Sequence, residues 1–252
     1  MKLKVISFNI RCCDDKNGNS VAERAPRLAA VTSPYSADVI GFQEYTPLWE
    51  KPIEEYFGKE YEIFNKYRTD TGHIESAPML WKKDKFECLK KGCFWFSDTP
   101  EVMSGCWDTL GHNRTCQYAI LKDRESGECF AFMNTHFGFG EENQVKSVCL
   151  VQKYAEELTQ YPVFITGDFN MTPDSAAYAQ MIKKMTDVNE ATVKDRRSTY
   201  HGYEPEVDKH EHIDYCFINE NVKPVSMKII DELVDGKFPS DHFGVYVELE
   251  LI

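Results

Sequence analysis

The chain has 252 residues, 42% of them hydrophobic, and carries 41 acidic against 29 basic side chains, for a formal charge of −12. This length suffices for one large α/β domain or two small ones, with a substantial core. Proteins that bind long nucleic acids usually present a basic face. The basic pairs here are scattered among acids, so long nucleic acid is disfavoured as the main ligand. No apolar run approaches membrane-spanning length, and we expect no membrane partner.

Eight stretches have the composition of strands, and helical patterns fall between several of them. The strands are predicted at 3–10, 38–44, 77–82, 116–122, 129–136, 163–169, 213–218 and 243–251. The helices are predicted at 22–33, 47–57, 143–159 and 174–185. This alternation indicates an α/β fold and, taken alone, favours a parallel sheet. No linker rich in Pro, Gly or Ser divides the chain, so residues 1–252 are predicted to form a single domain.

Polar side chains recur where the predicted strands begin or end. They are Asn9, Glu44, His136, Asp168 with Asn170, Asp214, and Asp241 with His242. In α/β folds, ligand sites gather at strand ends, where loops meet over a rigid sheet. The sequence therefore predicts one acidic pocket that also contains histidines.

Asp168 and Asn170 follow the apolar run VFIT, which is typical of a buried strand. Side chains two positions apart on an extended segment point the same way, so the two should leave the strand side by side. Asp and Asn also form Asx turns after strands. Taken alone, the pair fits such a turn better than a catalytic site.

The strand-end residues together have the chemistry of a metal-assisted hydrolase. Carboxylates and amides without Cys/His ligand spacing suit a hard ion such as Mg²⁺. Histidines beside that ion can bind an anionic transition state, and a carboxylate such as Asp168 can align or deprotonate water. These functions describe hydrolysis of a phosphate ester.

Six tracts, in one order between residues 4 and 249, resemble the endonuclease/exonuclease/phosphatase superfamily. They are SFNIR, GFQEY, NTHFG, TGDFN, HIDYCFI and PSDHF. That superfamily includes DNase I-like nucleases, abasic-site endonucleases, deadenylases, sphingomyelinases and inositol-phosphate phosphatases. The resemblance implies a four-layer α/β/β/α sandwich, in which two packed, mostly antiparallel sheets are flanked by helices. This differs from the parallel sheet that alternation alone favours.

The resemblance also implies a metal site. Glu44 would be the principal Mg²⁺ ligand, with Mn²⁺ as an alternative ion. Asn9 would lie close to the ion, and Asp241 would belong to the metal shell or its support.

Catalytic roles are implied for five further residues. Asp168 would align and activate the attacking water, and Asn170 would hold the scissile phosphate. His242, oriented or charged by Asp214, would contact a phosphoryl oxygen. His136 would be the second histidine that faces the phosphate.

Around the tract YRTDTGHIESAPMLW the resemblance is looser. Glu75 matches a position that supports the catalytic histidine, so we pair it with His136. Arg68 and Arg114 fall where related bacterial members carry arginines, which offer a bidentate fork to phosphate. Their alternative role is a structural ion pair. After NTHFG the chain departs from many relatives, which puts the substrate rather than the reaction in doubt.

Other polar tracts are weaker candidates. His210-Glu211-His212 invites a zinc interpretation, which we reject because Asp214 is the functional member of that motif. Trp107 and the pair Tyr200-His201 either line the substrate entrance or pack ordinary loops.

The predicted function is a Mg²⁺- or Mn²⁺-dependent phosphoesterase, more specifically a phosphodiesterase acting on a small or nucleotide-type phosphate ester. One alternative is a nuclease, DNase-like or specific for abasic sites. Another is a non-catalytic binding module on the same fold, against which the complete set of motif residues argues.

The nine cysteines form an odd set without a CxxC pair, which predicts reduced thiols in a cytoplasmic protein. The oligomeric state stays open.

Overall fold

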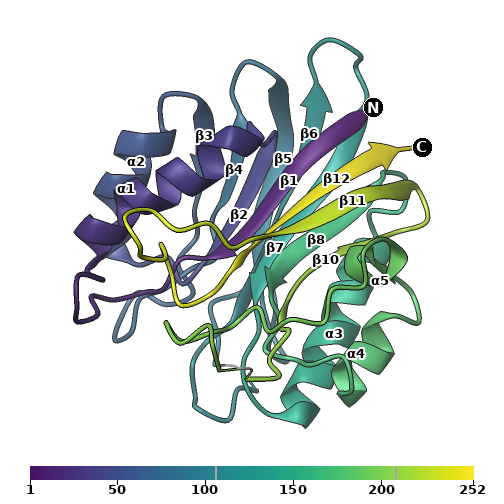
Figure 1. The fold of residues 1–252 in the computed structure, drawn as a ribbon. Coiled ribbons are helices and arrows are strands. Elements are labelled where there is room, and N and C mark those ends of the chain that lie inside the picture. The colour runs from purple at the N-terminus through teal and green to yellow at the C-terminus, as the bar shows by residue number, and fades with distance from the viewer. Residues whose placement is uncertain (106, 208) are drawn as a thin grey trace.

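Two six-stranded sheets pack face to face in the computed structural model, which describes residues 1–105, 107–207 and 209–252 (Figure 1). The first sheet contains, in spatial order, β11 (Val222–Ile230), β12 (Gly244–Leu251), β1 (Lys2–Asn9), β2 (Val39–Gln43), β4 (Met79–Lys82) and β3 (Tyr61–Phe64). The second contains β5 (Phe86–Trp95), β6 (Thr115–Asp123), β7 (Cys129–His136), β8 (Val163–Asp168), β10 (Asp214–Ile218) and β9 (Thr186–Asp187).

Helices cover the outer face of each sheet and complete four layers (Figure 1). The helices α1 (Val21–Thr32) and α2 (Pro47–Phe57) pack on the first sheet, and a 3₁₀ turn (Ser33–Tyr35) follows α1. On the second sheet lie α3 (Glu141–Glu156) and α4 (Ala176–Met181), followed along the chain by the short α5 (Val188–Ala191). A third apolar cluster fills the space between the sheets. The chain therefore forms the sandwich that the family resemblance implied.

The sheets are mostly antiparallel, so the parallel sheet favoured by strand–helix alternation alone is wrong. Among the described strands, the parallel pairs are β1 with β2 and β7 with β8. Each of these pairs is joined through one helix, α1 or α3, as parallel neighbours require a crossover. The other pairs are antiparallel.

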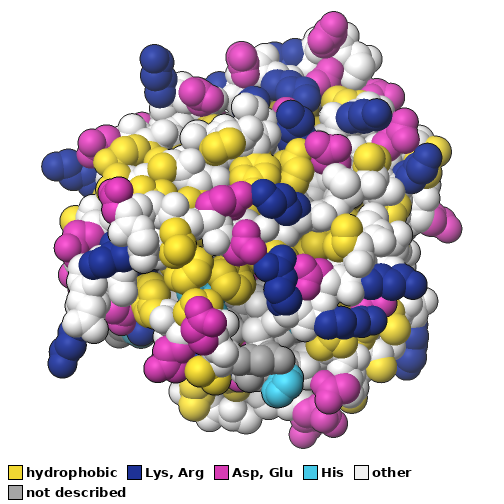
Figure 2. Space-filling model, in the orientation of Figure 1, with side chains coloured by type: hydrophobic (Ala, Val, Ile, Leu, Met, Phe, Trp, Pro, Cys, Tyr) yellow, Lys and Arg dark blue, Asp and Glu magenta, His cyan; other side chains and the backbone are white. Residues whose placement is uncertain are grey.

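The eight predicted strands all occur, and four further strands were missed. Those four are β3, β5, β9 and β11, and each lies at an edge of its sheet. The predicted helix at 174–185 is shorter than expected, because α4 ends at Met181. None of the described helices has the length and apolar character needed to span a bilayer. Acidic and basic side chains are interspersed on the face shown in Figure 2.

Candidate active site

Strand periodicity directs the predicted site residues into the gap between the sheets. Side chains two positions apart lie on one face of a strand. On β1, Leu3 and Val5 belong to the core between the sheets, so Asn9 points into the same gap. On β8, Phe164 belongs to that core, so Asp168, four positions later, points into the same gap. The site therefore lies where the core between the sheets ends.

Strand register places three of these side chains next to one another on the second sheet. Asp168 pairs with His136 on the parallel neighbour β7 and with Asp214 on the antiparallel neighbour β10. Facing residues of paired strands bring their Cβ atoms to about 5 Å. Asp168 is thus flanked by a histidine on one side and a carboxylate on the other.

A buried polar layer separates this site from the apolar core. The Asn134 amide donates to the carbonyls of Phe42 (2.8 Å) and Pro78 (2.9 Å) on the opposite sheet. Its Oδ1 accepts from Gln43 Nε2 (2.8 Å) and from the Thr166 hydroxyl (2.9 Å). Gly41 is required here, because a Cβ at that position would lie 2.4 Å from Asn134 Oδ1. The layer holds the two sheets in register beneath the site.

Asp168 is the centre of the site. Its Oδ2 accepts from Asn9 Nδ2 at 2.9 Å and lies 3.5 Å from His136 Nε2 and 3.9 Å from His242 Nε2. Burial raises the pKa of Asp168, and Asp214 adds to this effect, while the two histidines lower it. A buried carboxylate with two imidazoles in reach suits an acceptor of a water proton.

His242 forms a close pair with Asp214. Its Nδ1 lies 2.9 Å from Asp214 Oδ2, and both side chains are buried. Burial disfavours the charged ring, but the attraction of Asp214 outweighs it and raises the pKa of His242 to about 10. His242 is therefore an imidazolium at neutral pH. Its free edge, Nε2, faces the centre of the site.

His136 pairs with a carboxylate that two arginines share. Its Nδ1 lies 3.1 Å from Glu75 Oε1, as the resemblance implied. The same oxygen accepts from Arg68 Nη1 at 3.0 Å and Arg114 Nη1 at 3.4 Å. Burial alone would raise the pKa of Glu75, but His136, Arg114 and Arg68 hold it well below its usual range. Glu75 is thus a fixed anion beneath three potential donors to phosphate.

Asn170 makes the turn contact and also lines the pocket. Its backbone N–H donates to Asp168 Oδ1 at 3.0 Å, which is the Asx-type contact. Its side chain lines the same pocket as Asp168 and donates from Nδ2 to the Phe137 carbonyl at 3.0 Å. The turn aligns the two side chains, so it does not exclude a site.

Three residues at the pocket have backbone in the left-handed region. Arg11, Glu44 and Asn170 have φ of 62°, 60° and 48°. Residues other than glycine adopt this conformation rarely, and such conformations cluster at functional sites. The neighbouring Asn9 holds Arg11 in place, because Asn9 Oδ1 accepts from the Arg11 N–H at 3.0 Å.

The predicted metal ligands are hard oxygen donors. Glu44 Oε1 accepts from Asn9 Nδ2 at 3.2 Å, and its Oε2 accepts from the Cys12 N–H at 2.8 Å. Burial raises the pKa of Asp241, and repulsion from Glu44 adds to this rise against the attraction of His242. A divalent cation between Glu44 and Asp241 would relieve that repulsion. The residues therefore fit an oxygen-liganded ion such as Mg²⁺.

A second grouping of ligand-type atoms lies nearby. Among the described residues, Asp168, Asp214 and His242 bring one such atom each within 4.8 Å of one another. Within this grouping, His242 Nδ1 already bonds to Asp214 Oδ2. The carboxylates on the Glu44 side of the pocket lie outside that pair and suit an ion better.

A cavity of about 430 Å³ opens above these groups. All of the predicted site residues line it except Asn9 and Asp214, which lie beneath. Further residues that the sequence did not assign to the site also line it: Arg11, Cys12, His73, Leu110, His112, Phe139, Glu211 and Ile213. Arg11 and Ile213 stand in the quoted tracts SFNIR and HIDYCFI, which were usable signals. The others come mostly from loops that carry no motif.

Of the weaker candidates, the structure places Tyr200 at the pocket and Trp107, His201 and His212 elsewhere. Trp107 packs against the apolar cluster of the second sheet and donates to Asp98 at 3.2 Å, away from the pocket. Tyr200 lines the pocket, whereas its neighbour His201 lines another. His212 is buried, with Nδ1 2.9 Å from the Arg197 carbonyl. Among the described residues, the grouping of ligand-type atoms includes none of residues 210–212.

Comparisons with known proteins agree with the fold. A solved endonuclease/exonuclease/phosphatase of Bacteroides vulgatus is 28% identical, with a TM-score of 0.90 and all of both chains covered. The mannosyl-6-phosphatase of Bacteroides thetaiotaomicron VPI-5482 is 27% identical, with a TM-score of 0.89 over 99% of this chain and 100% of that one.

A curated sequence relative is more distant. The Ccr4 subunit of the CCR4-Not complex of Candida albicans, a 3′-5′-exoribonuclease, is 24% identical over 57% of this chain. The match spans only 22% of that protein's length. The model of the Endonuclease/Exonuclease/phosphatase family matches residues 6–242, nearly the whole chain. The chain therefore belongs to the endonuclease/exonuclease/phosphatase family.

Proposed function

We propose that this protein hydrolyses phosphate esters of small molecules with the help of Mg²⁺ or Mn²⁺. The observation that carries the proposal is the position of Asp168. It is buried at the base of a cavity, held by Asn9 and within 4 Å of His136 and His242. This arrangement combines a proton acceptor with two groups that can bind a phosphoryl oxygen.

Each site residue has its own role in an in-line displacement at phosphorus. Asp168 aligns the attacking water and accepts its proton. His242, kept protonated by Asp214, donates to the phosphoryl oxygen that gains charge, and His136 binds the phosphate from the other side. Asn170 holds the scissile group. The ion, held by Glu44, Asn9 and Asp241, would neutralise charge on the phosphate and the leaving oxygen.

Cavity size and charge support a small substrate. About 430 Å³ is within the range of small-molecule pockets. Arg11, Arg68 and Arg114 line the cavity and can bind an anion. They stand beside acidic side chains that suit a metal ion: Glu44, Glu75, Asp168, Glu211 and Asp241. The sequence favours a diester. The likeness to a protein named mannosyl-6-phosphatase supports a sugar phosphate monoester as second candidate.

The decisive experiment compares wild type with Asp168→Asn on three substrates in Mg²⁺: bis(4-nitrophenyl) phosphate, 4-nitrophenyl phosphate and mannose 6-phosphate. We expect metal-dependent turnover that falls by about 10²–10⁴ in the variant. Asp174→Asn, an exposed carboxylate after the same strand, is the matched control. Turnover of the diester alone would select the phosphodiesterase, and turnover of the sugar phosphate would select the monoesterase. Full activity of Asp168→Asn would contradict the role of Asp168.

A further inference from the structure

A buried arginine binds the segment that joins β1 to α1. Arg24 of α1 is fully buried, and among the described residues no carboxylate forms an ion pair with it. Its guanidinium donates instead to backbone carbonyls, those of Ile10, Arg11 (3.1 Å), Cys13 (2.6 Å) and Asn19 (2.9 Å). A buried charge is costly unless it is paired or hydrogen-bonded. The carbonyls of this segment therefore take the place of a counter-ion.

Two side chains from the start of α2 bind the same segment. Trp49 Nε1 donates to the Arg11 carbonyl at 2.8 Å, and the Thr46 hydroxyl donates to the Cys12 carbonyl at 2.8 Å. Thr46 is the N-cap residue of α2, but its side chain makes no capping hydrogen bond to that helix. Each carbonyl of the segment 10–13 is thus held by Arg24, Thr46 or Trp49.

The N–H groups of the same segment bind the proposed metal ligands. The Arg11 N–H donates to Asn9 Oδ1 at 3.0 Å, and the Cys12 N–H donates to Glu44 Oε2 at 2.8 Å. The left-handed backbone of Arg11 is a conformation in which successive N–H groups can be presented to negatively charged oxygens. Such a conformation persists only where its surroundings fix it, and here Arg24 and Trp49 both hold the Arg11 carbonyl.

Glu44 depends on these contacts for its direction. One carboxylate oxygen is held by the Cys12 N–H, and the other accepts from Asn9 Nδ2 at 3.2 Å. A shift of the segment 10–13 would move the Cys12 N–H and turn the carboxylate. Outer contacts of this kind orient metal ligands, and changing them typically costs about 10–100-fold in metal affinity or activity.

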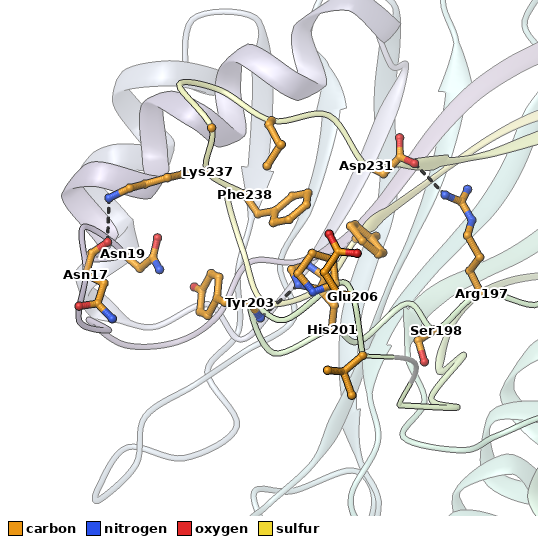
Figure 3. A pocket seen from close by; sticks show the side chains of 15 residues that line it. Asn17, Asn19, Arg197, Ser198, His201, Tyr203, Glu206, Asp231, Lys237 and Phe238 are labelled. Atoms are coloured by element: carbon orange, nitrogen blue, oxygen red, sulfur yellow. Dashed lines mark hydrogen bonds and ion pairs between the residues drawn. The ribbon is translucent and has the colours of Figure 1, made fainter.

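Arg24 itself contacts neither of the two large cavities. The segment after β1 reaches from the active site to a second cavity of about 740 Å³, where Figure 3 shows Asn17 and Asn19. Of the residues that the structure describes, none lines both cavities, and Arg24 lines neither. Its effect on the active site must therefore pass through the backbone that it holds.

We propose that Arg24 is a positioning residue for the divalent metal ion. It fixes Glu44 and Asn9 through the segment 10–13 and touches neither the ion nor the substrate. The inference rests on the proposed function, because it requires that Glu44 bind the ion.

The test is the affinity of the whole chain for Mn²⁺, measured by electron paramagnetic resonance of the free ion, without substrate. Arg24→Lys keeps the positive charge, so repulsion of the metal ion is unchanged, but it loses the planar fork that reaches several carbonyls. We expect its Mn²⁺ affinity to fall by about 10–100-fold. Thr46→Val removes the hydroxyl that holds the Cys12 carbonyl and should weaken Mn²⁺ binding about threefold. Glu44→Gln, which should bind far more weakly than wild type, identifies the site.

Gln152→Met provides the control for a loss of stability alone. Gln152 of α3 is 2% exposed, and its amide donates to the carbonyls of Gln180 (2.9 Å) and Met181 (3.2 Å) on the outer side of the second sheet. The variant should unfold more easily than wild type and bind Mn²⁺ equally well.

Three results would overturn the positioning role. They are unchanged Mn²⁺ affinity in Arg24→Lys, unchanged affinity in Thr46→Val, or an equal loss of affinity in Gln152→Met. Thr46→Val decides the question if Arg24→Lys does not fold. Failure of the proposed metal site gives a different result, because wild type would then bind no Mn²⁺ or Glu44→Gln would bind it as tightly as wild type. The inference would fall with that site.

Discussion

The two histidines of the active site are held in different ways. Each pairs with a carboxylate across the sandwich: Asp214 of β10 reaches His242 before β12, and Glu75 before β4 reaches His136 of β7. His242 has its carboxylate nearly to itself, and one oxygen, Asp214 Oδ1, has no partner among the described residues. Glu75 instead shares its charge among His136 and two arginines.

The difference implies that Asp214 mainly keeps His242 charged, whereas Glu75 mainly holds His136 and the two arginines in place. A single close carboxylate gives its full attraction to one imidazole, which raises the pKa of His242 to about 10. A shared carboxylate stabilises several cations at once and binds the surrounding loops. We therefore expect the Asp214 pair to matter most for turnover and the Glu75 cluster to matter most for stability.

Glu75→Gln should show the largest effect. The change leaves the buried Arg68 without its anion and Arg114 with only Asp108, at 3.6 Å from its Nε. Breaking a buried pair in this way costs about 3–5 kcal/mol. Urea unfolding followed by circular dichroism measures the free energy of unfolding. Glu128→Gln removes a half-exposed partner of the N-terminus and should cost less than about 1 kcal/mol. Equal losses in the two variants would refute the anchoring role.

Asp214→Asn should reduce turnover by about 10²–10³, because His242 would lose the carboxylate that keeps it charged. The kcat of the variant should fall with little change in KM, since the donor acts mainly on charge that develops in the transition state. The double variant Asp214→Asn/His242→Gln provides the control. It should be hardly slower than either single variant, because the two residues act as a unit. Losses that multiply would show independent roles.

The interior of both sheets was predictable, and the edges were not. The eight strands that the sequence pattern predicted are the interior strands of the two sheets. Interior strands are covered on both faces and give dense apolar runs such as VFIT. Edge strands carry the charges and prolines that prevent aggregation, as in the Lys90-Lys91 pair of β5 and Pro224 of β11. Their apolar pattern is therefore diluted.

The site residues divide in a similar way: those at the ends of interior strands could be predicted, and those on loops could not. Residues at the ends of interior strands, such as Asp168 and His136, converge as their motifs implied. His73 and His112 line the same cavity from loops, with ring centroids 5.7 Å apart. His73 falls in the loosely matching tract YRTDTGHIESAPMLW but was not assigned to the site, and no motif marks His112. A loop reaches the site only through tertiary packing, so the sequence pattern does not show this convergence. Arg68 and Arg114 were expected there, but the sequence did not show that both bind one oxygen of Glu75.

The Glu75 cluster should also make stability depend on acid pH. Glu75 has a folded-state pKa below its unfolded value near 4.3, so below about pH 4 the unfolded chain takes up a proton that the folded chain does not. Its contribution is present above that pH and is lost as the pH falls, by at most about 1.4 kcal/mol per pH unit. The free energy of unfolding, measured with urea between pH 5 and 3, should therefore fall more steeply with decreasing pH for wild type than for Glu75→Gln. Parallel curves would show that other carboxylates dominate.

The smallest and most diagnostic effect concerns the two arginines. Lysine keeps the charge but loses the planar fork that binds phosphate through two N–H groups. For Arg114→Lys we expect KM to rise about tenfold, the usual worth of one charge-assisted hydrogen bond, with kcat nearly unchanged. Arg68→Lys should change KM less, because Arg68 Nη2 already donates to His73 Nδ1 at 2.8 Å. Steady-state kinetics together with unfolding curves distinguish the two roles. If both variants lose stability while KM stays at the wild-type value, the arginines serve Glu75 and not the substrate.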